Sequence, residues 1–277
     1  MVKRLTLAEV DEAERLYTVE SLSFAKIGKR LGVSDVAIRN QLVKRNVVIR
    51  SLSESHRKIP CNHRYFGEPL DEYRAYWIGF LLADGGITEK KYGQTDRVTV
   101  RLAKVDLPHL EKLASALESE HKITTLSEEG SVQFSVSSSE IVDDLSRFKV
   151  IPRKSACHCF SDRIPGNLLH HYFRGYFDGN GGISQHSRSK WAINCAAGEH
   201  FLIAFRDWIA SRLGGHPATI SFRDGIHRMA WSGTHRCREI LDLMYADATV
   251  FLDRKMEKYN QIVRDADSSP RKSYNRR

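Results

Sequence analysis

The sequence predicts an α+β protein made of two similar halves and preceded by a small all-helical domain. The first observation is a motif that occurs twice, as Y-W-I-G-F-L-L-A-D-G-G-I from Tyr76 and as Y-F-R-G-Y-F-D-G-N-G-G-I from Tyr172. The second is that the same order of helical and strand-like patterns follows each copy, which predicts αββαββα in each half. The third is a pair of short amphipathic helices before residue 50.

The first motif copy is predicted to form a buried helix, because an apolar run closes on Asp84 and a Gly-Gly pair. The C-terminal end of a helix carries partial negative charge, so a carboxylate there needs a cation or a turn contact to offset it. A metal ion would do so. In both copies a glycine lies five residues before the polar residue, Gly79 before Asp84 and Gly175 before Asn180. Since glycine inside a helix costs about 1 kcal/mol relative to alanine, its recurrence predicts that another helix approaches the backbone there.

The two copies, W-I-G-F-L-L-A-D-G and F-R-G-Y-F-D-G-N-G, resemble the motif of the LAGLIDADG homing endonucleases. In that family, paired motif helices deliver an acidic residue from each C-terminal end to a shared metal site. The resemblance implies the single-chain, pseudo-symmetric form, in which each repeat supplies an antiparallel four-stranded sheet that lies along a DNA major groove. The alternative from the residues alone is two core helices with ordinary Asp-Gly and Asn-Gly turns.

The amino-acid composition limits the kinds of molecule that this protein is expected to bind. The 277 residues are 41% hydrophobic, enough for a real core, and carry 43 Lys and Arg against 34 Asp and Glu, a net charge of +9. This balance suits a polyanion, which could be DNA, RNA or an anionic membrane. No stretch approaches the roughly 20 apolar residues of a membrane span, and the start of the chain is not a signal-peptide core, so we expect an intracellular, cytoplasmic protein that does not enter a membrane.

Five cysteines do not indicate a disulfide framework. Cys61 with His63, and the run from Cys157 to Cys159, could make a zinc site, but their spacing is not that of a usual finger or ribbon. We therefore expect ordinary reduced thiols.

Residues 1–50 are predicted to form a helix-turn-helix domain that binds DNA. A short amphipathic helix, a turn centred on glycine and a second helix capped by Ser34 follow one another between residues 23 and 42. Val36, Ala37 and Leu42 are expected to pack inward. The expected DNA-facing side chains of the second helix are Ser34, Asp35, Arg39, Asn40, Gln41, Lys44 and Arg45. A helical domain that binds protein or packs on its neighbour is the alternative.

The remaining chain divides into a linker at 51–70, repeat 1 at 71–160, repeat 2 at 161–265 and a basic, disordered tail at 266–277. The strands are predicted at 87–92, 97–103, 122–127 and 131–136 in the first repeat, and at 183–187, 190–196, 218–222 and 226–231 in the second. Helices are predicted at 107–117, 139–148, 199–213 and 233–245.

Hydrolysis of a phosphodiester needs a divalent metal to activate water and to neutralise charge on the phosphate. Asp84 is the first candidate ligand. The resemblance also implies that the backbone carbonyls of Ala83 and Gly179 bind metal, with two or three Mg²⁺ ions between the motif helices and no organic cofactor. It further places basic residues of the catalytic pocket at Lys154 and Lys255, for which the alternative is a surface lysine paired with nearby acids.

The second motif departs from the family pattern. Aligned through its glycines, the position that matches Asp84 is Asn180, whereas Asp178 matches Leu82 and lies two residues too early. Asparagine keeps the size of aspartate but loses its charge, so metal binding should weaken on that side. Three accounts fit: a nicking enzyme, a DNA binder without catalysis, or an active enzyme deliberately changed at one carboxylate. We favour the third, because the rest of the motif is intact.

The function predicted from the sequence is a site-specific, metal-dependent double-strand DNA endonuclease of the homing type, acting as a monomer on a long double-stranded target. Base contacts are expected from alternate side chains of the sheets. These candidates are Arg97, Thr99, Arg101, Gln133, Gln185, Arg188, Asn194 and Arg228. The alternatives are a non-catalytic transcription regulator of LAGLIDADG-like fold and an RNA maturase.

Overall fold

The structure is a computed structural model that describes residues 5–20, 22–50, 59–88, 96–126, 130–152, 159–187, 190–215 and 217–268. The chain divides into two compact units, Met1–Lys58 and Ile59–Arg277, and each unit is described by itself. No helix within these ranges is both long enough and apolar enough to cross a membrane.

The first unit is a three-helix domain made of α1 (Leu7–Thr18), α2 (Phe24–Leu31) and α3 (Asp35–Lys44). Side-chain caps begin all three helices: Thr6 forms a capping box with Glu9 on α1, and Ser23 and Ser34 cap α2 and α3. Between α2 and α3 the chain turns at Gly32, whose φ of 73° is the left-handed conformation that favours glycine. Apolar side chains from each helix meet in a small core: Ala13, Leu16, Tyr17, Ile27, Ile38 and Leu42.

One expected core residue of α3 lies outside. Val36 is 60% exposed, whereas Ile38, which we did not assign to the core, is fully buried. The reason is helical phase: Ile38 and Leu42 are four residues apart and share the inner face, while Val36 lies with Asn40 and Val43 on the outer face.

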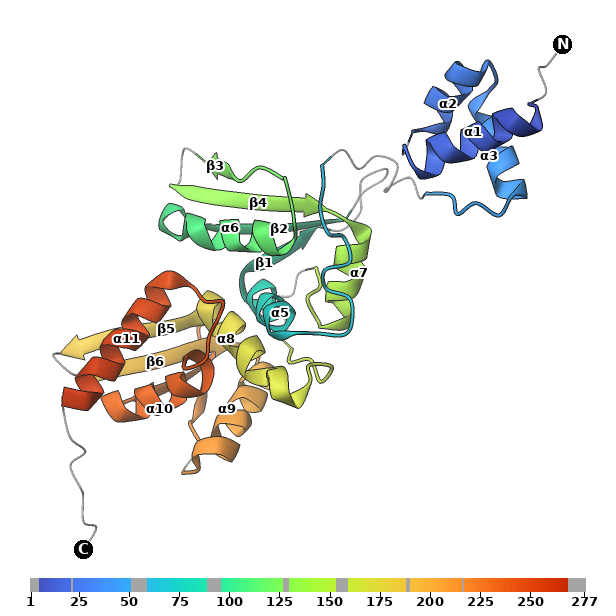
Figure 1. Cartoon of the computed structure of the whole chain (residues 1–277). Coiled ribbons are helices and arrows are strands. Elements are labelled where there is room, and N and C mark those ends of the chain that lie inside the picture. Colours follow the sequence, from blue (N-terminus) through green and yellow to red (C-terminus); the bar gives the residue numbers. More distant parts are fainter. Residues whose placement is uncertain are drawn as a thin grey trace, which may run out of the picture. The chain divides into compact units, whose positions relative to one another are not determined.

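The second unit contains two repeats of the same order (Figure 1). The first consists of α5 (Glu72–Asp84), β1 (Gly85–Thr88), β2 (Arg97–Ala103), α6 (Leu107–Ala116), β3 (Thr124–Leu126), β4 (Ser131–Ser137) and α7 (Ser139–Arg147). The second consists of α8 (Leu169–Asn180), β5 (Gly181–Ser187), β6 (Lys190–Ala197), α9 (Glu199–Leu213), β7 (Ile220–Arg223), β8 (Ile226–Ser232), α10 (Thr234–Tyr245) and α11 (Asp253–Ser268). Both sheets are antiparallel, with strand orders β1-β2-β4-β3 and β5-β6-β8-β7. The predicted α+β fold of two αββαββα repeats is confirmed.

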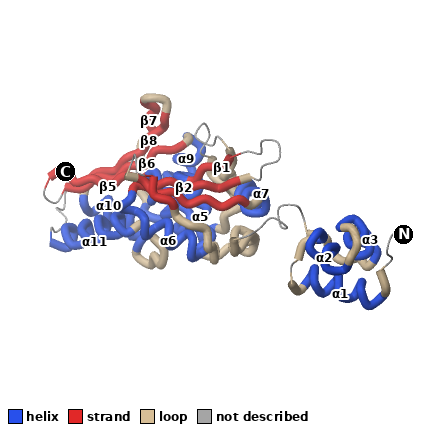
Figure 2. Tube along the Cα trace, turned by 90° about the horizontal axis from the view of Figure 1, so that it is seen from above, coloured by secondary structure: helices blue, strands red, loops and turns tan. Residues whose placement is uncertain are grey.

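Helices and strands form separate layers in this unit. Figure 2 shows the strands of both sheets in one layer and helices α5, α6, α10 and α11 below them. Apolar residues alternate along the strands, as in Val98 and Val100 of β2 and Val132, Phe134 and Val136 of β4, so the core lies between the sheets and the helices. The opposite face of each sheet is therefore open to a partner.

Three predicted boundaries change. The linker is shorter than 51–70, because Phe66 is buried in the core of the second unit and the Asn62 backbone N–H donates to the Leu117 carbonyl. Strand β1 begins at Gly85, directly after the motif helix, rather than at residue 87. The supposed tail from residue 266 begins inside α11, which continues to Ser268.

Helix α11 was missed by the sequence analysis. Its buried residues are Lys255, Tyr259, Ile262 and Ala266, spaced by four, three and four positions. This spacing is helical, but only two of the four residues are strongly apolar, and a buried lysine reads as a surface position.

Candidate functional site

The two motif helices pack with their backbones in contact at the repeated glycine. A Cβ atom added at Gly79 would lie 2.0 Å from the carbonyl oxygen of Tyr172, and one added at Gly175 would lie 1.9 Å from that of Tyr76. Distances this short allow no side chain, so the glycines let α5 and α8 approach each other more closely than any other residue would permit.

The C-terminal ends of α5 and α8 converge at the next small residue. A Cβ atom at Gly179 would lie 2.4 Å from the Ala83 Cβ and 3.2 Å from an Asp84 carboxylate oxygen. Asp84 and Asn180, the last residues of the two helices, are both partly exposed. The structure therefore brings Gly179 beside two of the other candidate metal ligands, Ala83 and Asp84, and Asn180 follows Gly179 directly in the chain.

These four residues offer oxygen donors: one carboxylate, one carboxamide and two backbone carbonyls. Mg²⁺ prefers such hard oxygen ligands and keeps several waters, so a site with one carboxylate fits it, though with less charge than a pair of carboxylates. Among the described residues, no group of three or more His, Cys, Asp or Glu side chains is placed to hold a metal ion. The fit therefore depends on Asp84 and on the oxygens around it.

Asn180 takes part in a hydrogen-bond chain within its own half. Its side-chain nitrogen donates to the Tyr176 hydroxyl oxygen at 3.2 Å, and the Tyr176 hydroxyl donates to the Ala196 carbonyl at 3.1 Å. An amide suits this position because Tyr176 already gives its proton to Ala196, leaving its oxygen to accept.

Lys255 lies beside the end of α8 and is 2% exposed. Its Nζ donates to the Phe177 carbonyl and, at 2.7 Å, to the Gly181 carbonyl, on either side of Asn180. Burial lowers the pKa of Lys255 to about 8, and the carboxylates of Asp178 and Asp84 oppose that change. Lys255 therefore supplies a fixed positive charge at the negative end of the α8 dipole. Lys154 falls outside the described residues.

Asp178, which was not among the candidate site residues, accepts hydrogen bonds from three different parts of the second unit. It is fully buried and accepts hydrogen bonds from the Tyr76 hydroxyl at 2.7 Å, the Tyr245 hydroxyl at 2.5 Å and the Leu252 backbone N–H at 2.9 Å. Burial raises the pKa of Asp178, and Lys255 and these three donors oppose that rise. The sequence signal was the pair of charged residues Arg174 and Asp178, four residues apart and flanked by aromatic residues.

On the first sheet, the candidate base-contacting residues share one face. Arg97, Thr99 and Arg101 alternate with buried valines on β2, and Gln133 pairs with Arg101. Hydrogen bonds link this face across the strands, with Thr99 and Ser135 hydroxyls 3.0 Å apart. The result is a polar surface opposite the helical layer.

On the second sheet, two candidates share the outer face and one does not. Asn194 and Arg228 are exposed and belong to the set of side chains that faces away from the helices. Gln185 instead pairs with buried Trp191, on the helix-facing side, and a β-bulge follows it. Gln185 therefore does not share the sheet face of Asn194 and Arg228, because strand alternation depends on a register that sequence does not fix, and its contact with DNA stays a prediction. Arg188 is outside the described residues.

Among the candidates on α3, Arg39, Asn40 and Lys44 are exposed and Gln41 is partly buried. Ser34 and Asp35 are engaged at the helix start: the Ser34 hydroxyl accepts from the Ala37 N–H, and the Asp35 carboxylate accepts from the Val36 N–H. Arg45 is tied to Asp11 and Glu14 by ion pairs. The exposed donors of α3 are thus fewer than the sequence suggested.

The oxidation state of the cysteines differs from the expectation. Cys61, Cys195 and Cys237 are reduced, but Cys159 is disulfide-bonded, contrary to the expectation of reduced thiols throughout. Cys157 and His158, which were considered as zinc ligands and not favoured, lie outside the described residues.

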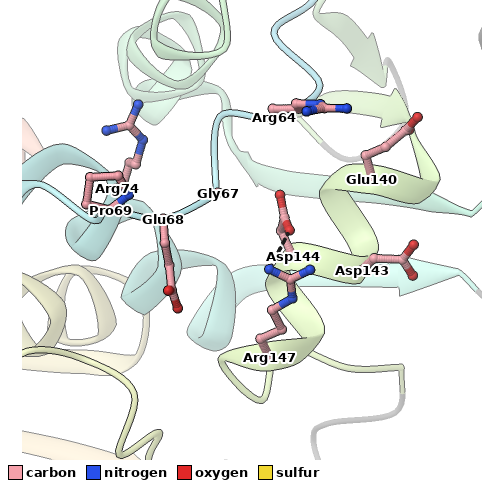
Figure 3. A pocket seen from close by; sticks show the side chains of 9 residues that line it. All are labelled: Arg64, Gly67, Glu68, Pro69, Arg74, Glu140, Asp143, Asp144 and Arg147. Carbon is pink, nitrogen blue, oxygen red and sulfur yellow. Dashed lines mark ion pairs between the residues drawn. The ribbon is translucent and has the colours of Figure 1, made fainter.

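A separate pocket of about 660 Å³ lies between the segment after residue 59 and helix α7 (Figure 3). Its charged lining residues are Arg64, Glu68, Arg74, Glu140, Asp143, Asp144 and Arg147. Three arginines and four carboxylates line this pocket, and Arg147 pairs with Asp144 at 3.3 Å. None of the residues at the ends of the motif helices lines this pocket.

Known protein families and curated proteins give no match to this chain. Among solved structures, the meganuclease I-SmaMI bound to uncleaveable DNA with a TTCT central four matches with a TM-score of 0.50 and 10% identity, over 70% of this chain and 90% of that chain. I-SmaMI is a LAGLIDADG homing endonuclease. This chain shares its fold. The LAGLIDADG meganuclease I-AabMI bound to uncleaved DNA matches with a TM-score of 0.49 and 11% identity, over 72% of this chain and 91% of that chain. I-LtrWI, a LAGLIDADG homing endonuclease bound to target DNA, matches with a TM-score of 0.48 and 12% identity, over 70% of this chain and 89% of that chain.

Proposed function

We propose that this protein is a site-specific, Mg²⁺-dependent DNA endonuclease of the homing type, in which Asn180 impairs one of two strand-cleaving positions. The observation that carries the proposal is the convergence of the two motif-helix ends, where the Asp84 carboxylate lies 3.2 Å from the position of a Cβ on Gly179. Two helix ends held this close can both contact the same short stretch of DNA backbone, where metal-assisted hydrolysis of a phosphodiester would take place.

The residues have distinct roles in this proposal. Asp84, with the backbone carbonyls of Ala83 and Gly179, would hold divalent metal; when bound, the metal activates water and neutralises charge on the phosphate. Lys255 places a positive charge beside this site and lowers the cost of bringing a phosphate to it. Asn180 adds an oxygen ligand without charge.

The two sheet faces suit double-stranded DNA. Arg97 and Arg101 are exposed on the first, and Asn194 and Arg228 are exposed on the second. Arginine, asparagine and glutamine are the side chains that pair with guanine and adenine edges in a major groove. I-SmaMI, whose fold this chain shares, was solved bound to DNA, which supports a DNA partner. We propose that the N-terminal unit is a helix-turn-helix that adds contacts through Arg39, Asn40 and Lys44.

The test is cleavage selection on a randomised DNA library, with Mg²⁺, using the chain as it is and its Asn180→Asp form. We expect the Asn180→Asp form to linearise plasmids that carry the selected site, while the unaltered chain nicks them or binds without cutting. Failure of the Asn180→Asp form to cut any selected sequence would overturn the proposal.

The second candidate, a non-catalytic DNA-binding regulator, is favoured by one observation. The amide of Asn180 donates to Tyr176, whose own proton goes to Ala196, so the local network is built for an amide. The same selection separates the two: a regulator enriches a DNA sequence by binding, and the Asn180→Asp form leaves that sequence intact.

A further inference from the structure

We propose that Asp178 is a positioning residue that fixes Lys255 beside the candidate active site, in one half of the protein only. This inference rests on the proposed endonuclease activity. Asp178 lies in the last turn of α8, two residues before Asn180, but its side chain is fully buried, and it acts through the segment that carries Lys255.

The first step is the start of α11. The Asp178 carboxylate accepts the Leu252 backbone N–H at 2.9 Å, and α11 begins at the next residue. Lys255 lies in the first turn of this helix, so the carboxylate and the lysine are joined by a single short, hydrogen-bonded stretch of backbone. Moving the start of α11 would move Lys255 away from the Phe177 and Gly181 carbonyls.

The second step is the connection that precedes α11. The Tyr245 hydroxyl, at the end of α10, donates to Asp178 at 2.5 Å. One turn earlier on α8, buried Arg174 donates to the Val250 carbonyl at 2.9 Å and to the Met244 carbonyl at 2.7 Å. Residues four apart share a helix face, so Arg174 and Asp178 together fasten this connection to α8.

The third step links the other half. Tyr76 of α5 donates to Asp178 at 2.7 Å, and its hydroxyl lies 3.0 Å from Nε2 of buried His109 on α6. At the matching position of the first repeat stands Leu82, which is fully buried and apolar. The buried carboxylate is therefore present in the second repeat only, and it binds Tyr76 of the first repeat as well as the segment before Lys255.

A packing role alone would not need a carboxylate. A buried ion is expensive, and well-packed apolar residues of similar volume are often equal or better for stability. Leu82 is such a residue in the first repeat. Three donors from three elements converge on Asp178, which fixes the direction of the backbone at Leu252 more closely than apolar contacts can.

The experiment compares Asp178→Leu and Asp178→Asn in the full chain carrying Asn180→Asp, with single-turnover cleavage and DNA affinity measured separately. Asp178→Leu should lower the cleavage rate by about 10- to 100-fold, as expected when a supporting residue is lost, and change the DNA Kd by less than about threefold. Asp178→Asn should cut at a rate within about tenfold of its parent, because its oxygen can accept from Leu252 and Tyr76 while its nitrogen donates to the Tyr245 oxygen.

Action through Lys255 is tested by a double-mutant cycle with Lys255→Met. If Asp178 works by placing Lys255, the double variant should lose no more rate than Lys255→Met alone. The matched control is Asp242→Asn, which alters another carboxylate that holds α11, since Asp242 accepts the Tyr259 hydroxyl at 2.7 Å. This control should cut like its parent.

Additive losses in the cycle, or an equal loss in Asp242→Asn, would overturn the inference. If Asp178→Leu does not fold, as judged by thermal unfolding, Tyr245→Phe removes one hydrogen bond to the same carboxylate and should lower the rate by about two- to tenfold, again only when Lys255 is present. An inactive Asn180→Asp parent would instead refute the proposed function.

Discussion

Replacing Gly175 by alanine should separate the two motif helices and disable the site. The added Cβ would lie 1.9 Å from the Tyr76 carbonyl oxygen and 2.9 Å from the Phe80 nitrogen. Both neighbours are backbone atoms of α5, so no side chain can rotate away. Restoring a contact of about 3 Å requires the helices to move apart by at least about 1 Å.

This movement should lower both the free energy of unfolding and the cleavage rate. Overpacking of a core costs about 1–3 kcal/mol, and a backbone clash belongs at the upper end; alanine returns about 1 kcal/mol through its better helix propensity. We therefore expect a net loss of about 2 kcal/mol in the free energy of unfolding, or a fall in Tm of about 4–8 °C. A displacement of about 1 Å between the ends carrying Asp84 and residue 180 should lower cleavage about 100-fold.

The assay is urea unfolding together with single-turnover cleavage by the Asn180→Asp form. Gly166→Ala is the matched control, because a Cβ at Gly166 meets no atom within 4 Å and the residue has no positive φ. It should leave both measurements unchanged. A Gly175→Ala variant as stable and as active as its parent would refute the contact between the two helices.

Four further predictions follow from the same contacts. Gly179→Ala places a methyl group 2.4 Å from the Ala83 Cβ and should lower cleavage by the Asn180→Asp form at least about tenfold, measured as linear product. Arg174→Met removes a buried cation that bonds two carbonyls and should cost about 3–5 kcal/mol in urea unfolding; a loss below about 1 kcal/mol would contradict this. Burial lowers the pKa of His171 to about 4, so the unfolded chain takes up the proton first and stability should fall as pH drops from about 6.5 to 4; in His171→Gln, thermal unfolding should lose the His171 share of that slope and keep the share of His109, whose pKa burial lowers to about 3. Arg39→Ala should weaken DNA binding and reduce the salt slope by about 1, whereas Arg15→Ala, the same charge change on α1 at an arginine paired with Glu12, should not.

The sequence by itself determined the repeated helix, strand and turn order of this protein. Apolar periodicity and the recurring glycines are local signals. Gly79 and Gly175 destabilise a helix, so their presence inside the motif helices indicates where two helices pack closely. The same signals located Asp84 and Asn180 at helix ends, because a Gly-Gly pair terminates each motif.

Only the tertiary structure decided which polar residues are used. Gln185 and Asn194 look alike in a strand pattern, and the pairing register places them on opposite faces. In the sequence, Lys255 was placed in the catalytic pocket only by resemblance and Asp178 stood two residues too early in its motif. Both are buried, and they are joined through Leu252, over 70 residues from Asp178 along the chain. A buried charge depends on partners that are distant in sequence, and hydrophobic patterning carries no record of them.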